Sequence, residues 1–299
     1  MRPLAEERVA QDRILARNIY NTSRSLYEYA HNLGSNGAFP MTADRSVPYW
    51  SADRVRHDST VMAALRGLTT GSSWLDVGAG EATTMRALAS VYGPERPLLV
   101  GVTAALPDAT RHALAHPMGT WRAAEPIAND KKRFEAPATY LLSDGVRLLS
   151  GMRLGDIPRS WLGRFDVVTD VFGAVTYDED LRGALLRCVQ HTKVGGLLGI
   201  CVPYAYACQM PARPEGKDAE RLQLELRDAN GVFVHPLDWL ARASGLEVVE
   251  SAYSNEGNTN LYIGLRRTAA KVELPRLELV EFTSGRPPVR RYRVVDDAP

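Results

Sequence analysis

The first 68 residues carry apolar side chains at helical spacing. Over residues 4–32 these side chains recur three, four and seven positions apart, which predicts an amphipathic helix, and residues 52–68 repeat the pattern. The intervening residues 33–50 are rich in Gly, Asn, Pro and Ser, which predicts a loop. The chain is therefore expected to begin with two helices joined by a loop that could act as a hinge.

From residue 72 onward, short apolar runs alternate with helical stretches, which cover residues 82–92, 178–192 and 235–244. This alternation predicts an α/β fold with a doubly wound, Rossmann-like sheet of seven mostly parallel strands. The last two runs are joined by a turn-rich segment without a helical pattern, so we expect the last strand to be antiparallel. The seven runs are Trp74–Val77, Leu98–Val102, Tyr140–Leu142, Phe165–Thr169, Leu197–Val202, Glu247–Val249 and Leu261–Leu265.

These patterns divide the chain into three parts. We expect residues 1–50 to form an N-terminal helical lid over the carboxyl edge of the sheet. Residues 51–270 are expected to form the sheet domain itself. Residues 271–299 hold four prolines and several arginines, which predicts a C-terminal tail or an edge strand.

Charge and hydropathy narrow the range of partners. The chain has 36 Lys and Arg against 35 Asp and Glu, and a net charge of +1 argues against a nucleic-acid partner. Only five of the 36 basic residues are Lys, an enrichment in Arg that we interpret as a coding bias. The most apolar run, Val194–Val202, is far too short to span a bilayer, and the charged N-terminus lacks the apolar stretch of a secretory signal. We therefore expect a cytoplasmic protein without a membrane partner. The sequence is compatible with a homodimer.

Cysteine and histidine show no metal-binding pattern. The three cysteines are odd in number and lack the close pairing of a zinc site. Among the six histidines, no pair at helical spacing has a carboxylate partner. We expect no metal ion.

The sharpest motif in the chain is Leu75-Asp76-Val77-Gly78-Ala79-Gly80-Glu81-Ala82, which follows an apolar strand and opens a helix. Glycines at such a turn let the backbone approach a ligand closely. The third glycine of the dinucleotide pattern is missing, because Thr83 stands in its place, and this counts against a dinucleotide. An acidic residue instead precedes the first glycine by two positions.

This arrangement resembles motif I of the class I S-adenosylmethionine-dependent methyltransferases. The resemblance implies that Gly78, Ala79 and Gly80 approach the amino-acid part of S-adenosyl-L-methionine and that Asp76 helps to order the turn. The usual third glycine of this family is Ala82 here, which is a mild departure. The alternative is that the motif is only a tight turn between a strand and a helix.

Two further strands resemble those of the same family. The run Leu98–Val102 resembles its second strand, after which the family places an acidic residue for the ribose hydroxyls; here that position is Thr103, which brings no charge. The run Tyr140–Leu142 resembles its third strand, followed by Ser143, Asp144 and Gly145. The resemblance implies that Asp144 accepts a hydrogen bond from the adenine amino group. The alternative is that Asp144 caps a helix that starts near Val146.

The segment after the fourth strand carries the candidates for chemistry. Phe165–Asp170 resembles the family's fourth strand, but the His pair that many small-molecule members have after it is absent, so no His base is expected there. Asp170 and Tyr177 remain as catalytic candidates, and Asp170 and Phe172 as cofactor contacts. For Asp170, a buried helix cap is the alternative.

Aromatic residues are the remaining candidates, because an aromatic face can stabilise or guide a sulfonium cation. Tyr27, Tyr29 and Trp50 lie in the predicted lid, and Tyr204 follows the fifth strand. For any one of them, packing of the lid onto the sheet is the alternative role.

The resemblance implies S-adenosyl-L-methionine as the cofactor and a transferase that acts on a small molecule. Methyl transfer by in-line displacement, in specialised metabolism, is the leading hypothesis. A second hypothesis uses the aminocarboxypropyl arm of the cofactor, by transfer or by cyclisation such as azetidine-2-carboxylate formation, and releases methylthioadenosine. A third is a non-catalytic module that binds the cofactor.

Overall fold

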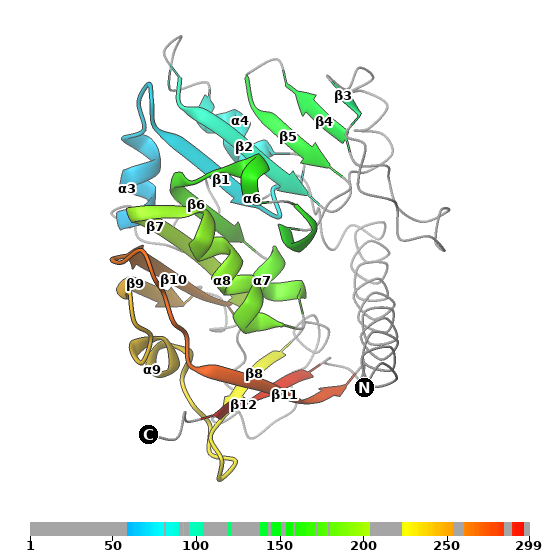
Figure 1. Cartoon of the computed structure of the whole chain (residues 1–299), viewed down its shortest axis with the longest axis vertical. Helices are drawn as coiled ribbons and strands as arrows, with labels where there is room; N and C mark the ends of the chain where they lie inside the picture. Colours follow the sequence, from blue (N-terminus) through cyan, green and yellow to red (C-terminus); the bar gives the residue numbers. More distant parts are fainter. Residues whose placement is uncertain are drawn as a thin grey trace, which may run out of the picture.

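The computed structural model of the chain describes most of the predicted sheet domain and the C-terminal strands (Figure 1). The predicted helix over residues 4–32 and the loop over 33–50 lie outside the described residues. The described residues are 59–80, 82–89, 92, 96–103, 119–120, 138–142, 145–150, 154–157, 159–171, 173–178, 180–203, 223–253, 260–283 and 289–295.

A nine-stranded sheet with the order β3-β4-β5-β2-β1-β6-β7-β10-β9 forms the centre of the molecule. Its parallel strands are β5 (Arg147–Ser150), β2 (Leu98–Thr103), β1 (Ser73–Val77), β6 (Phe165–Val171) and β7 (Thr192–Pro203). β10 (Asn260–Arg267) is antiparallel both to β7 and to β9 (Leu246–Tyr253), as predicted for the last strand. The doubly wound, mostly parallel sheet is therefore confirmed.

The third parallel strand was predicted in the wrong place. Residues 138–141 form β4 (Ala138–Leu141), which is antiparallel to β5, and β4 also pairs with β3 (Gly119–Thr120). A tight hairpin reverses the chain: Leu142 N–H donates to Val146 O at 2.9 Å, and Gly145 adopts φ +79°. The alternative role of Asp144 required a helix from about Val146, but Arg147–Ser150 is the strand parallel to β2. Its buried Leu148 and Leu149 face the two sides of the sheet.

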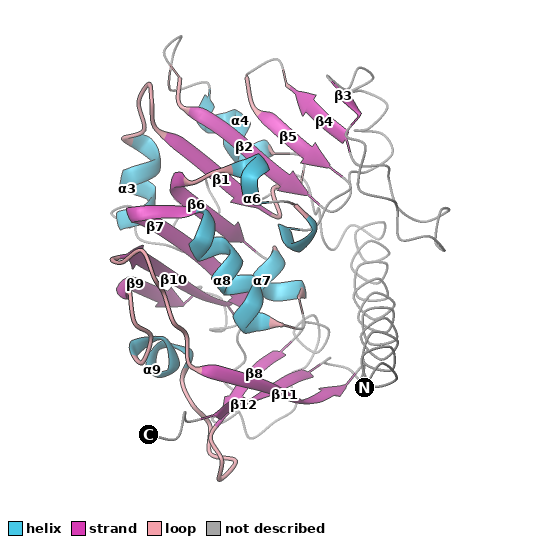
Figure 2. Cartoon of the chain, viewed as in Figure 1, coloured by secondary structure: helices cyan, strands magenta, loops and turns pink. Residues whose placement is uncertain are grey.

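Helices cover both faces of the sheet (Figure 2). The side chains of successive strand residues alternate between the two layers. On one face, α3 (Thr60–Arg66) and α4 (Thr83–Ala89) pack over Trp74, Leu99 and Leu148. On the other face, α8 (Leu181–His191) and α9 (Pro236–Ala241) pack over Leu75 and Leu198. The remaining short helices are η1 (Leu154–Asp156), α6 (Arg159–Leu162) and α7 (Ala174–Tyr177). Within the described part of the chain, no helix is both long and apolar enough to cross a bilayer.

A second, three-stranded sheet packs against the same core. Its order is β11-β12-β8, in which β12 (Val289–Val295) is antiparallel to β11 (Arg276–Thr283) and parallel to β8 (Gln223–Arg227). Leu224, Leu226, Tyr292 and Val294 are buried in the cluster that α8 and α9 cover. The predicted tail over residues 271–299 thus supplies both β11 and β12, and the long insertion after β7 leads into β8.

One carboxylate connects helix α3 to the edge strand β9. Glu250 on β9 accepts hydrogen bonds from Ser59 Oγ at 3.0 Å and from the backbone N–H groups of Thr60 and Val61 at 2.5 and 3.1 Å. Tyr262 Oη donates to the same carboxylate at 2.8 Å. A carboxylate at a helix N-terminus satisfies N–H groups that have no partner within the helix.

Candidate functional site

The glycine turn lies at the carboxyl end of β1, in the middle of the sheet. Gly78 and Gly80 adopt φ of +78° and +57°, a region that residues with a Cβ rarely occupy, and Ala82 follows at +58°. The N–H groups of Gly78 and Ala79 both donate to Val102 O, at 2.8 and 2.9 Å, which holds the turn against β2. The backbone of the turn is therefore fixed in the conformation that its glycines allow.

The neighbouring strand leaves room for this turn. A Cβ on Gly101 of β2 would come within 3.0 Å of Ala79 Cβ and of Leu148 Cδ1. Gly101 thus lets the turn lie close over β2, a requirement that the sequence analysis did not identify. The signal was present, because Gly101 is the one residue without a side chain in an otherwise apolar run.

Asp76 is buried at the end of β1 and is held by a chain of side-chain hydrogen bonds. Trp74 Nε1 donates to Thr169 Oγ1 at 2.8 Å, and the Thr169 hydroxyl donates to Asp76 Oδ1 at 2.7 Å. Asp76 and Thr169 are partners in the parallel register of β1 and β6, so their side chains share one face of the sheet. These hydrogen bonds link the side chains of β1 and β6 next to the glycine turn.

Asp170, at the end of β6, projects to the opposite face. Its carboxyl group is completely buried and accepts hydrogen bonds from the N–H groups of Gly173, at 2.9 Å, and Val175, at 3.2 Å. Burial raises the pKa of Asp170 to about 7; these backbone hydrogen bonds oppose the rise, and the charge of Asp76 adds to it. The side chain of Asp170 is thus placed as the buried cap at the start of α7.

Helix α7 is held tightly at both ends. A Cβ on Gly173 would lie only 2.4 Å from Val77 O, so glycine is needed where α7 starts beside the end of β1. At the other end, Arg290 Nη1 of β12 donates to Thr176 O at 2.9 Å and to Asp178 O at 3.0 Å. Arg290 is fully buried, and the second sheet thereby fixes the position of α7. Sequence reasoning missed this arginine.

Thr103 ends β2, which pairs with β1, and Ser150 ends β5, which pairs with β2 on its other side. They are partners in the parallel register of β2 and β5, and both side chains are buried. The Ser150 hydroxyl has no hydrogen-bond partner among the described residues. Ser150 was not predicted as a site residue, because the sequence analysis assigned the third parallel strand to an earlier segment.

Several predicted site residues lie outside the described part of the chain. These are Tyr27, Tyr29, Trp50, Ser143, Asp144, Phe172 and Tyr204, and for Tyr177 the structure describes only the backbone, in α7. Gly145, beside Asp144, is described: a Cβ there would lie 2.7 Å from Arg96 Nη1, near the start of β2. Leu142 and Gly145 lie at the amino edge of the sheet, opposite the glycine turn.

Metal-binding side chains do not gather in the described residues: no group of three or more His, Cys, Asp or Glu is placed there to hold a metal ion. Cys188 of α8 lies with its Sγ 3.9 Å from Asp170 Oδ2, and burial, followed by this carboxylate, raises the pKa of its thiol. A buried thiol whose pKa is raised is unreactive.

Comparison with known proteins returns similar structures but no similar sequences. No family model matches the chain, and no curated protein matches it. A variant of the 16S rRNA (adenine(1408)-N(1))-methyltransferase from Catenulisporales acidiphilia, with its cosubstrate S-adenosylmethionine, is 19% identical, with a TM-score of 0.37 over 70% of this chain and 90% of that one.

Two methyltransferases with other substrates are also similar. The glycopeptide N-methyltransferase MtfA, complexed with S-adenosylmethionine, is 14% identical, with a TM-score of 0.39 over 69% of this chain and 91% of that one. The N,N-8-amino-8-demethyl-D-riboflavin dimethyltransferase RosA from Streptomyces davawensis is 14% identical, with a TM-score of 0.36 over 65% of this chain and 49% of that one.

Proposed function

We propose that this chain, whose sheet has the class I S-adenosylmethionine-dependent methyltransferase fold, is a methyltransferase that uses S-adenosyl-L-methionine. The observation that carries the proposal is the glycine turn at the end of β1. The chain proceeds from β1 to β2 on one side and later returns to β6 on the other, so the turn lies where the strand order reverses. Open α/β sheets bind their ligands in the crevice at such a point.

The residues around the turn fit this cofactor. The positive φ angles of Gly78 and Gly80 present backbone to a ligand without an intervening side chain, which suits the amino-acid part of the cofactor. The buried Ser150 hydroxyl lacks a partner among the described residues and lies beside Thr103, at the strand end where the family binds the ribose. A ribose hydroxyl would satisfy it, because buried hydroxyls normally have a hydrogen-bond partner.

When bound, S-adenosyl-L-methionine supplies a methyl group on a sulfonium. This chain then has to hold the acceptor close to that methyl and in line with it, and a dedicated base is optional. Asp170 is occupied with the N–H groups of α7, so we assign it a positioning role through the shape of the 170–177 segment. Tyr177 remains the candidate for contact with the acceptor.

We propose a small molecule as the acceptor, in specialised metabolism and in the cytoplasm. The support is the net charge of +1, since a nucleic-acid substrate calls for a basic excess that this chain lacks. Residues 1–50 are proposed as a lid that excludes water from the sulfonium, with Tyr27, Tyr29 and Trp50 as its candidate contacts.

Two leucine substitutions test the cofactor site. Gly80→Leu places a side chain at positive φ in the turn, and Gly71→Leu does the same in the loop before β1, where a Cβ meets nothing within 4 Å. Both variants carry the same kind of backbone strain, and only the first alters the proposed site. Calorimetry should show S-adenosyl-L-methionine binding to the wild type and to Gly71→Leu, and at least about tenfold weaker binding to Gly80→Leu. Equal affinity in both variants would refute the assignment.

The reaction is tested by its products. With a small-molecule extract as the source of acceptor and a labelled methyl group, S-adenosylhomocysteine and a labelled small molecule are expected. Methylthioadenosine would instead indicate transfer or cyclisation of the aminocarboxypropyl arm. Binding without either product would indicate a non-catalytic module.

A further inference from the structure

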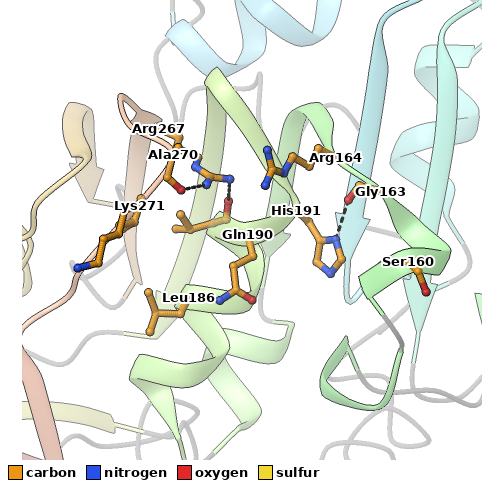
Figure 3. Close-up of a pocket in the computed structure, with 11 residues that line it drawn as sticks. Ser160, Gly163, Arg164, Leu186, Gln190, His191, Arg267, Ala270 and Lys271 are labelled. Atoms are coloured by element: carbon orange, nitrogen blue, oxygen red, sulfur yellow. Dashed lines mark hydrogen bonds between the residues drawn. The ribbon is translucent and has the colours of Figure 1, made fainter.

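A cavity of about 540 Å³ opens at the amino edge of the sheet, the edge opposite the glycine turn (Figure 3). It forms where Arg164 precedes β6, His191 precedes β7 and Arg267 ends the antiparallel β10. The figure shows the side chains of Arg164 and Arg267 extending toward each other. None of the described residues that line the cavity is acidic.

Arg267 is a fixed positive charge in the wall of this cavity. Its Nε donates to Ala269 O at 3.0 Å, its Nη1 to Val189 O and Thr192 O at 3.1 and 2.7 Å, and its Nη2 to Ala270 O. Only 4% of the residue is exposed. These acceptors are neutral carbonyls that use four of the five N–H groups, so the guanidinium keeps its charge and one donor.

Arg164 brings a second positive charge to the same place. It is exposed and, within the part of the chain that the structure describes, makes no hydrogen bond or ion pair. Burial, and after it the charge of Arg164, lowers the pKa of Arg267, which agrees with two nearby guanidinium groups. Lys271 does not join them, because its ammonium points away and pairs with Glu273 Oε1 at 2.5 Å.

We propose that this cavity binds a small ligand through a phosphoryl group. Two guanidinium groups that face each other without a counter-charge repel, and a dianion between them removes the repulsion and matches their charge. The planar donor fork of arginine suits phosphate oxygens. Gln190 also lines the cavity. Leu186, Val189 and Val272 form an apolar wall that suits the carbon skeleton of an organic phosphate.

The experiment measures binding by the full-length protein at constant ionic strength. Inorganic phosphate and ribose 5-phosphate are the probes, and ribose is the control without a phosphoryl group. Arg164→Gln removes the free charge, Arg164→Lys keeps the charge but not the fork, and Arg66→Gln removes an exposed arginine of α3 outside the cavity. Circular dichroism checks that each variant is folded.

We expect saturable binding of a phosphoryl probe and none of ribose. Arg164→Gln should weaken this binding at least about tenfold, Arg164→Lys less, and Arg66→Gln not at all. If ribose 5-phosphate binds more tightly than inorganic phosphate, the sugar contacts the apolar wall. If the two probes bind equally, the site recognises the phosphoryl group alone. The proposal fails if neither probe saturates, or if Arg164→Gln and Arg66→Gln weaken binding equally. The outcome does not depend on methyl transfer.

Discussion

The buried carboxyl group of Asp170 should make the stability of the protein fall as the pH rises. Burial raises the pKa of Asp170 from 3.8 to about 7, so between these two values the folded chain keeps a proton that the unfolded chain releases. The unfolded state binds fewer protons in this window, and the free energy of unfolding therefore decreases with increasing pH. The contribution of the protonated Asp170 carboxyl group to the free energy of unfolding is fully present below about pH 4 and is lost as the pH passes 7.

The size of the effect follows from the same two pKa values. A pKa difference of about 3, at about 1.36 kcal/mol for each unit, amounts to about 4 kcal/mol across the window. Asp170→Asn removes the titration and keeps one acceptor oxygen for the N–H groups of Gly173 and Val175, of which one then lacks its partner. The lost hydrogen bond lowers the free energy of unfolding of the variant by about 1 kcal/mol at every pH.

The assay is urea-induced unfolding of the wild type and Asp170→Asn at pH 5, 6, 7 and 8. The variant should be close to the wild type or slightly more stable at pH 5, and its advantage should grow until about pH 7 and persist at pH 8. Asp238→Asn, which removes an exposed carboxyl group of α9, is the control. The difference in stability between this variant and the wild type should not change with pH. If the difference between wild type and Asp170→Asn stays constant with pH, Asp170 is ionised in the folded protein and its hydrogen bonds outweigh its burial.

Three further substitutions test other parts of the structure. Glu250→Ala should lower the free energy of unfolding by about 2 to 3 kcal/mol, because three donors at the start of α3 and the Tyr262 hydroxyl lose their acceptor. Arg290→Met should cost a similar amount, about 2 to 3 kcal/mol, because Thr176 O and Asp178 O lose a charged donor. Asp144→Ala should leave the affinity for S-adenosyl-L-methionine unchanged, because the described neighbours of Asp144 lie at the amino edge of the sheet.

Control variants test the first two of these predictions, and a binding assay tests the third. Glu247→Ala, exposed on the same strand as Glu250, and Arg293→Met, exposed on the same strand as Arg290, should change stability by less than about 0.5 kcal/mol. A loss as large in these controls would contradict the roles given to Glu250 and Arg290. Calorimetry with S-adenosyl-L-methionine decides on Asp144→Ala, where a tenfold loss of affinity in a folded variant would restore the adenine contact implied by the family resemblance.

The central strands and the glycine turn could be predicted from the sequence because both depend on local patterns. A run such as Leu75–Val77 is buried on both faces, and only a parallel strand in the middle of a layered sheet needs that pattern. The glycines that follow it report a backbone conformation, which the structure shows as positive φ at Gly78 and Gly80. The antiparallel pairing of β9 and β10 was also predictable from a local pattern, because the segment that joins them has no helical pattern.

The third parallel strand could not be assigned in this way. Residues 140–142 and residues 147–150 are both short apolar segments, and a strand of four residues has too few positions to show a period. Residues 140–142 were predicted to form this strand because an acidic residue follows them, as the family resemblance requires. Pairing with a strand far along the chain decides between the two segments: Arg147–Ser150 pairs with β2, whereas the earlier segment pairs with β5.

The roles of the arginines show a further limit of sequence reasoning. The enrichment in arginine was interpreted as a coding bias, yet Arg290 and Arg267 are both buried and donate hydrogen bonds to defined acceptors. Those acceptors are backbone carbonyls, and Arg290 bonds to one that lies 114 positions away in the chain. Because every residue has a carbonyl, no pattern of side chains marks the partner. A buried arginine of this kind becomes recognisable only when the fold shows which helix end it reaches, and here that helix end belongs to α7, beside the proposed cofactor site.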